Sequence, residues 1–189
     1  RADVALLVVD GEEGVTEQDE HIAGFVLDEY KGLVIIVNKW DAVEKDTYTM
    51  TEFTKTIRER LHFVPWAPII YISALSGQRI HGVLETAHAV WETRSLRLQT
   101  SDLNRVVRDA VQNHPPPTKG TRRLKLYYAT QVATDPPLFL FHVNDKKLLH
   151  FTYRRYLENQ IRDAFPFEGT PIRFSFRESK GTPRERDNG

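Results

Sequence analysis

Three apolar runs of strand length, each followed by a stretch with helical periodicity, constrain the fold of this chain more than any other feature. They span residues 4–9, 33–37 and 68–72. Strands without polar positions are typical of parallel sheets that are covered on both faces. The alternation therefore predicts an α/β fold for residues 1–97, with a parallel sheet and helices on both of its faces.

The pattern changes near residue 97. An amphipathic helical stripe stops at the proline run 115–117, and two strands follow at 124–132 and 138–143. A second helical stripe and an alternating strand that begins at Ile172 complete the order α-β-β-α-β. We therefore expect a small α+β domain over residues 98–178, followed by a polar tail at 179–189.

Composition excludes several classes of function. The 189 residues contain no cysteine, which rules out disulfides, thiolate metal sites and cysteine nucleophiles. The lack of cysteine also fits a cytoplasmic location. No stretch approaches the roughly 18 uncharged apolar residues of a membrane span. The first 100 residues carry 10 Lys and Arg against 16 Asp and Glu, and the remainder carry 16 against 10. This asymmetry indicates either an anionic partner for the second half or mutual attraction of the halves.

Two short polar motifs follow the second and third predicted strands. Residues 38–41 read Asn-Lys-Trp-Asp, and residues 73–74 read Ser-Ala. In open α/β sheets, ligands bind beyond the carboxyl ends of the strands. Each motif alone also fits an ordinary surface turn, in which Asn and Asp are common. Their order at successive strand ends instead favours a shared binding site.

The residue types in these motifs match the hydrogen-bonding edge of guanine. An ionised Asp41 can accept from both N1–H and the exocyclic amine, whereas adenine would leave this carboxylate unpaired. Asn38 can donate to N7, and the stem of Lys39 can lie along the base plane. A backbone N–H at Ala74 can meet O6, with Ser73 ending the strand beside it. These five residues are the predicted guanine-binding site.

The second half contains basic residues that could contact RNA phosphates. The candidates are Lys119, Arg122, Arg123, Lys125, Lys146, Lys147, Arg154 and Arg155. For each, a structural role competes: Lys146 and Lys147 also fit a plain loop, and Arg154 begins an i, i+4 series that fits a solvated ladder of ion pairs. Six aromatic residues at strand spacing could stack on bases, but in a small domain they fit a core better. They are Tyr127, Tyr128, Phe139, Phe141, Phe174 and Phe176.

Several of these segments together resemble a known family. Residues 38–41 and 73–74 look like the fourth and fifth motifs of translation-factor-type GTPases. Segments within residues 114–173, among them His-Pro-Pro-Pro and Tyr-Arg-Arg-Tyr-Leu-Glu-Asn, are similar to the C-terminal part of the bacterial tandem GTPases Der, or EngA. The resemblance implies the second half of a Ras-like P-loop GTPase domain followed by a KH-like domain.

The same resemblance implies function and partners. The family is cytoplasmic, binds GTP or GDP with Mg²⁺, and acts in assembly of the large ribosomal subunit. The implied partners are guanine nucleotide, the large subunit with its ribosomal RNA, and the family's own GTPase domains through intramolecular contact. An alternative is a non-catalytic RNA-binding or regulatory module in which the partial GTPase domain is only a scaffold.

The chain departs from this family pattern in two places. It contains no Gly-x-x-x-x-Gly-Lys-Ser/Thr, and the acidic residues 10–14 fit an ordinary turn rather than a phosphate cradle. By the resemblance, the phosphate loop, the switches and the Mg²⁺ ligands would precede Arg1. We therefore predict no catalytic or metal-binding residue here, and no GTP hydrolysis by these 189 residues alone. Residues 101–189 also lack the Gly-x-x-Gly loop with which KH domains clamp RNA.

Overall fold

The computed structural model describes residues 2–179, which divide into two compact units. The first unit extends to Ser95 and also contains Phe167–Pro171, and the second contains Leu96–Pro166 and the residues from Ile172 onward. The sequence had assigned residues 98–178 to one domain, so the placement of 167–171 in the first unit differs from that expectation. Most of the predicted tail, residues 180–189, lies outside the described residues.

The first unit contains a parallel three-stranded sheet in the order β1-β2-β3. Its strands are β1 (Val4–Asp10), β2 (Gly32–Asn38) and β3 (Ile69–Tyr71). In the register, Asp10 lies opposite Asn38, and the last residue of β3 lies opposite the residue before Asn38. The carboxyl ends of all three strands therefore meet at one edge of the sheet.

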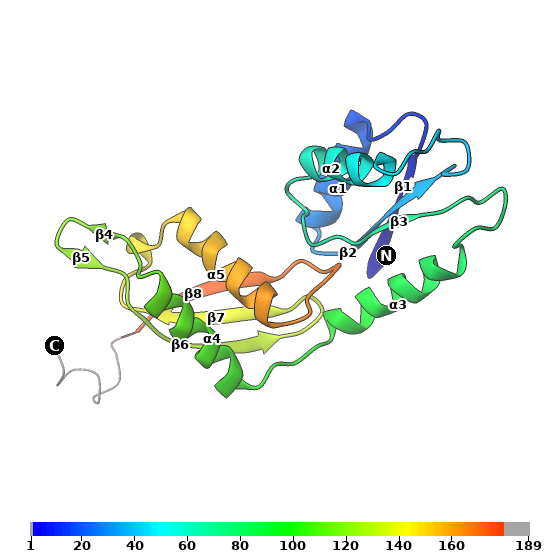
Figure 1. Cartoon of the computed structure of the whole chain (residues 1–189). Coiled ribbons are helices and arrows are strands. Elements are labelled where there is room, and N and C mark those ends of the chain that lie inside the picture. The colour runs from blue at the N-terminus through cyan, green and yellow to red at the C-terminus, as the bar shows by residue number, and fades with distance from the viewer. Residues whose placement is uncertain (1, 180–189) are drawn as a thin grey trace. The chain divides into compact units, whose positions relative to one another are not determined.

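Helices cover both faces of this sheet, as the sequence predicted. Figure 1 shows α1 (Glu17–Asp28) and α2 (Thr49–Arg60) on one side, and α3 (His81–Arg94) on the other. Thr16 caps α1 in a reciprocal capping box with Asp19. Two separate hydrophobic clusters form the core, one on each face, because successive residues of β2 point to opposite sides.

One expectation about β1 is wrong. Its apolar run predicted burial on both faces, yet the side chains of Leu6 and Val8 are 42% and 55% exposed. Leu7 and Val9, which point to the opposite face, are buried. The reason is the strand order: β1 lies at an edge, and within the described residues no element fully covers its α3 side.

The second unit has the predicted α-β-β-α-β order. It comprises α4 (Thr100–Asn113), β6 (Leu126–Ala133), β7 (Leu138–Val143), α5 (Phe151–Ala164) and β8 (Arg173–Glu178). The sheet order is β6-β7-β8, with β6 antiparallel and β8 parallel to β7. In Figure 1, α4 and α5 lie side by side along this sheet.

Four of the six aromatic residues at strand spacing lie on the helix-covered face. Phe139 and Phe141 are fully buried, and Phe174 and Phe176 pack against Phe141 with ring centroids 4.8 and 5.1 Å away. Tyr128 is different: it is 41% exposed and belongs to the other face of the sheet. The expectation of a core role therefore holds for the phenylalanines and is wrong for Tyr128.

Two small elements were not predicted. The hairpin formed by β4 (Thr118–Lys119) and β5 (Arg122–Arg123) turns at Gly120, whose φ is +64°. The 3-10 helix η1 (Lys146–Leu148) precedes α5. These elements are short and consist mostly of polar residues, so they lack the apolar run that marked the equally short β3. Among the described residues, no helix is long and apolar enough to cross a membrane.

Candidate functional site

Backbone hydrogen bonds join the two predicted motifs at the edge of the first sheet. The N–H of Trp40 donates to the carbonyl of Ile72 at 3.0 Å, and the N–H of Ile72 donates to the carbonyl of Val37 at 2.8 Å. These bonds extend the β2–β3 pairing beyond the strands themselves. The loops that follow β2 and β3 are thus held next to each other before any ligand is present.

A side chain completes this connection. The amide oxygen of Asn38 accepts a hydrogen bond from the backbone N–H of Ala74 at 3.0 Å. This N–H is the one that sequence reasoning assigned to O6 of guanine. It can serve a base only if it is shared with Asn38 or released from it. Asn38 therefore acts first as the link between the two motifs.

Asp41 and Ser73 form the second contact between the motifs. Ser73 is fully buried, and its hydroxyl accepts from the N–H of Ser76 at 3.1 Å. A hydrogen bond from the Ser73 side chain is the largest cause that lowers the pKa of Asp41 below 3.8, and the charge of Lys45 adds to it. Asp41 is exposed and ionised at neutral pH, so it can accept hydrogen bonds from two donors.

Lys39 points to an acidic turn that sequence reasoning treated as ordinary. Its Nζ lies 2.6 Å from Oδ2 of Asp10 and 3.8 Å from Oε2 of Glu12. Hydrogen bonding and charge lower the pKa of Asp10 and raise that of Lys39. The pair is exposed, so its contribution is the orientation of Lys39 rather than stability. Lys39 itself adopts the left-handed region, with φ of 59°.

The same turn approaches the first motif through its backbone. The N–H of Gly11 donates to the carbonyl of Asn38 at 2.8 Å. A Cβ at position 11 would lie 2.8 Å from that carbonyl oxygen, so only glycine fits without a shift. Asp10 and Gly11 therefore belong to the site, and sequence reasoning missed them. The available signal was their position at the end of β1, opposite Asn38 in the register.

Trp40 anchors the loop that follows β2 in the hydrophobic core. Its side chain is 4% exposed and packs against Phe53 and Tyr71, with ring centroids 5.5 and 4.5 Å away. Because this ring points into the core, the side chains on either side of it, Lys39 and Asp41, point outward. This alternation explains why position 40 holds a large apolar residue.

We expect Ser73→Ala to raise the pKa of Asp41 toward its ordinary value, because the substitution removes the hydrogen bond that lowers this pKa most. The pKa is measured by NMR of the labelled Asp41 carboxyl carbon. Asp46 is the internal control, since its lowered pKa comes chiefly from Tyr48 and Thr49. An unchanged pKa at Asp41 would show that Ser73 does not hold this carboxylate.

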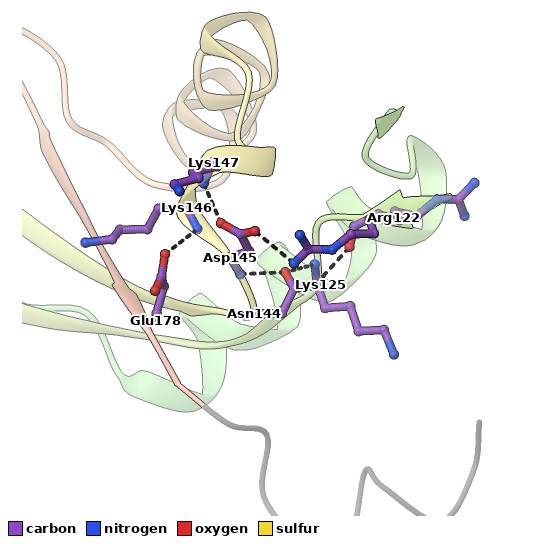
Figure 2. A network of polar contacts seen from close by, with 8 residues as sticks. Arg122, Lys125, Asn144, Asp145, Lys146, Lys147 and Glu178 are labelled. Atoms are coloured by element: carbon purple, nitrogen blue, oxygen red, sulfur yellow. Dashed lines mark hydrogen bonds and ion pairs between the residues drawn. The ribbon is translucent and has the colours of Figure 1, made fainter. Parts of the chain in front are cut away.

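In the second unit, Asn144 organises part of the predicted cationic cluster (Figure 2). Its side chain donates to the carbonyl of Arg123 at 3.0 Å and accepts from the N–H groups of Lys125 and Asp145 at 2.9 Å each. The side chain of Lys125 points away from this network in Figure 2. One amide side chain thus fixes the backbone around Arg123 and Lys125, which are both exposed.

Asp145 continues the network on the other side (Figure 2). It forms an ion pair with Arg122 at 2.9 Å and accepts from the N–H of Lys147 at 2.8 Å, while the N–H of Lys146 donates to Glu178 at 3.1 Å. The hairpin and η1 are thereby brought together. Arg122 is partly neutralised, since its carboxylate partner is only 15% exposed.

The remaining candidates are less connected. Lys119 lies opposite Arg122 in the hairpin and is exposed. Arg154 and Arg155 are exposed on α5, outside the hairpin and η1. The expected ladder along α5 is present in its second half, where Arg162 pairs with Glu158 at 3.1 Å. Five of the eight predicted cations thus meet around Asn144 and Asp145, namely Arg122, Arg123, Lys125, Lys146 and Lys147.

Comparison with known sequences matches the two parts of the chain to two described families. The elongation factor Tu GTP-binding domain matches residues 1–116, which is more than half of the chain. The chain belongs to that family. Residues 97–177 match a second family, the KH-domain-like domain at the C-terminus of EngA bacterial GTPases. The resemblance to the C-terminal part of the Der, or EngA, GTPases is therefore confirmed.

Individual relatives agree with this assignment. GTPase Der of Alkaliphilus oremlandii is 50% identical over 181 residues, which is 96% of this chain and 41% of the relative. GTPase Der of Caldanaerobacter subterraneus is 54% identical over 172 residues, which is 91% of this chain and 39% of that relative. The chain thus spans about two fifths of these relatives' length. Era of Aquifex aeolicus aligns over 98% of the chain and 68% of its own at 16% identity, with a TM-score of 0.41, too low to support an argument.

The two family matches divide the predicted residues between them. All five predicted guanine-binding residues lie within the GTP-binding-domain match, as do Asp10 and Gly11. All eight predicted cations lie within the EngA-type match. Among the described residues, no group of three or more His, Asp or Glu side chains could hold a metal ion.

Proposed function

We propose that the first unit recognises the guanine base of GTP or GDP. The observation that supports this most is the juxtaposition of Asn38, Asp41, Ser73 and Ala74 at the carboxyl edge of the parallel sheet. Hydrogen bonds between the two loops hold this edge in place before a ligand binds. Little ordering is then left for the nucleotide to induce, which favours affinity.

Asp41 is the residue that discriminates between bases in this proposal. As an ionised carboxylate it accepts from N1–H and the exocyclic amine of guanine. Adenine has an unprotonated N1 and only a C–H at C2, where guanine carries its amine, so the carboxylate would lose its solvent without gaining a partner. Asn38 approaches N7 with its amide nitrogen while its oxygen stays on Ala74. Lys39, held toward Asp10, lines the base with its methylene stem.

The test is an NMR titration of the chain with GDP and with ADP, because this method detects millimolar binding. We expect GDP to shift the amide signals of Asn38, Asp41 and Ala74 in a saturable way, and ADP to leave them unchanged. Equal shifts with both nucleotides, or none with GDP, would favour the alternative in which this unit is only a scaffold. Signals of Thr54 and Lys55 on α2 serve as a control for non-specific effects.

At the level of the whole protein, we propose a GTP hydrolase that acts in assembly of the large ribosomal subunit in the cytoplasm. Membership of the GTP-binding-domain family and the Der relatives support this proposal. Binding of Mg²⁺ together with the nucleotide belongs to this proposal. Contacts between the KH-like domain and the GTPase domains belong to the same proposal.

A second function is favoured by the cationic network in Figure 2. We propose that the KH-like unit binds ribosomal RNA through the hairpin and η1 cations. Asn144 and Asp145 hold the backbone of these residues, so phosphate contacts form with less loss of conformational entropy. Residues 101–189 also carry six more basic than acidic side chains, which favours a polyanion.

We expect Arg122→Ala/Arg123→Ala to weaken binding of ribosomal RNA and to flatten its salt dependence. Each lost phosphate contact reduces the slope of log K against log salt by about 0.7 to 0.9. The matched control is Arg105→Ala/Arg108→Ala on α4, which removes the same charge from exposed positions. If both double variants change the slope equally, the hairpin has no specific role.

A further inference from the structure

The second unit contains two neighbouring cavities beside the β4–β5 hairpin. One, of about 360 Å³, is lined by His114, Pro115, Tyr153 and Tyr156, and the other, of about 480 Å³, by Lys119, Lys147 and His150 among others. Pro117 and Thr152 line both, so the cavities adjoin each other. Together they form a groove between the segment that follows α4 and the start of α5.

The first cavity has aromatic walls that are already in place. The ring of His114 stacks on Tyr153, with centroids 6.1 Å apart and an interplanar angle of 21°, and meets Tyr156 at 5.0 Å. The hydroxyl of Tyr153 donates to the carbonyl of His114 at 2.9 Å, and that of Tyr156 to the carbonyl of Ala110 at 2.8 Å. Both hydroxyls are engaged, and Tyr153 is only 2% exposed, so the aromatic surface open to a ligand comes from the exposed His114 and the half-buried Tyr156.

The second cavity is cationic. Lys119 and Lys147 are exposed at its wall, and none of the residues that line either cavity is acidic. Lys119 comes from the β4–β5 hairpin, and the backbone of Lys147 is held by Asp145 within the network of Figure 2. The cationic cavity therefore adjoins the aromatic one, and the two share Pro117 and Thr152 as lining residues.

We propose that this groove binds one nucleotide of single-stranded RNA, with the base in the aromatic cavity and a backbone phosphate between Lys119 and Lys147. This rests on the proposed RNA-binding function and adds the position of the base and the strandedness of the ligand. A base within a duplex is stacked and paired, so only an unpaired base can enter the cavity. Aromatic walls accept any base, whereas the lysines supply the attraction to phosphate.

The experiment uses the full chain and a fluorescein-labelled RNA of about eight nucleotides, single-stranded or annealed, in anisotropy titrations at several salt concentrations. We expect the single strand to bind more tightly than the duplex. Lys119→Ala/Lys147→Ala should reduce affinity on the order of tenfold and lower the salt slope by about 1.4. His114→Ala should reduce affinity at least about fivefold with an unchanged slope, because it removes stacking and no phosphate contact.

A second readout locates the base directly. RNA that contains 5-iodouracil should photo-crosslink to His114 or Tyr156, identified by mass spectrometry. Equal affinity for single strand and duplex would overturn the proposal that the groove binds an unpaired nucleotide. Crosslinks confined to other segments, together with no effect of the lysine variant on affinity, would overturn it as well. If Arg122→Ala/Arg123→Ala still weakens binding in that case, the proposed RNA-binding function stands without it. If no RNA binds, both proposals fail.

Discussion

Asp41→Asn is expected to exchange the base that the first unit recognises. An asparagine amide offers one acceptor and one donor where the carboxylate offers two acceptors. The acceptor can still meet N1–H, but the donor now faces the exocyclic amine of guanine, which is also a donor. Xanthine carries a carbonyl at that position and restores the match. Guanine affinity should fall on the order of 100-fold, and xanthine affinity should rise.

The measurement is an NMR titration of the variant with GDP and with xanthosine diphosphate, compared with the unchanged chain. Glu44→Gln is the matched control, because it removes one exposed carboxylate from the same loop without touching either motif. We expect the control to retain the preference for GDP. A variant that loses both nucleotides equally would indicate that Asp41 supports the loop rather than the base.

The α/β frame could be predicted because its evidence is local. Burial of β2 on both faces is visible as an unbroken apolar run, and the alternation in β8 is visible as a period of two. The two motifs were placed correctly at strand ends for the same reason. In a parallel sheet, strand ends converge at one edge whatever the details of the loops.

The contacts within the candidate site could not be predicted in the same way. Pairing of Lys39 with Asp10 depends on which strand lies next to β2, and the sequence does not state the strand order. The bond from Ala74 to Asn38 joins residues 36 positions apart. Short polar side chains have many possible partners, so spacing alone does not select one.

The network around Asn144 was missed for a related reason. Sequence reasoning identified its cations by charge alone and left open whether Lys146 and Lys147 were only a loop. The structure adds the two side chains that hold these cations, the uncharged Asn144 and the acidic Asp145. Asn144 and Asp145 carry no positive charge, so a search for clustered Lys and Arg does not reveal that they hold the cations.

The placement of residues 167–171 required tertiary information, and it leads to the largest expected effect on stability. Gly169 donates its N–H to the carbonyl of Trp66 and accepts from the N–H of Leu33, both at 2.8 Å. Its φ is +73°, and a Cβ there would lie 2.1 Å from Cγ2 of Val90. No local pattern marks this segment as part of the first unit. Two of its partners, Trp66 and Leu33, lie more than 100 residues earlier in the chain.

We expect Gly169→Ala to destabilise the first unit by about 2–5 kcal/mol, since it combines left-handed backbone strain with overpacking against Val90. All three tryptophans lie within residues 1–95, so tryptophan fluorescence during urea unfolding reports this unit. Gly24→Ala in α1 is the matched control: nothing lies within 4 Å of its added Cβ, and helix propensity should make it neutral or stabilising.

A double-mutant cycle separates the two causes. Combining Gly169→Ala with Val90→Ala removes both Cγ atoms that the new methyl group meets and leaves only Cβ of Val90 at 3.0 Å, so most of the clash should be relieved while the φ strain remains. The pair should show a favourable coupling of about 1 kcal/mol or more. If Gly169→Ala instead leaves the fluorescence-detected transition unchanged, residues 167–171 do not pack into the first unit in solution. The boundary would then return to the continuous domain at 98–178 that sequence patterns predicted.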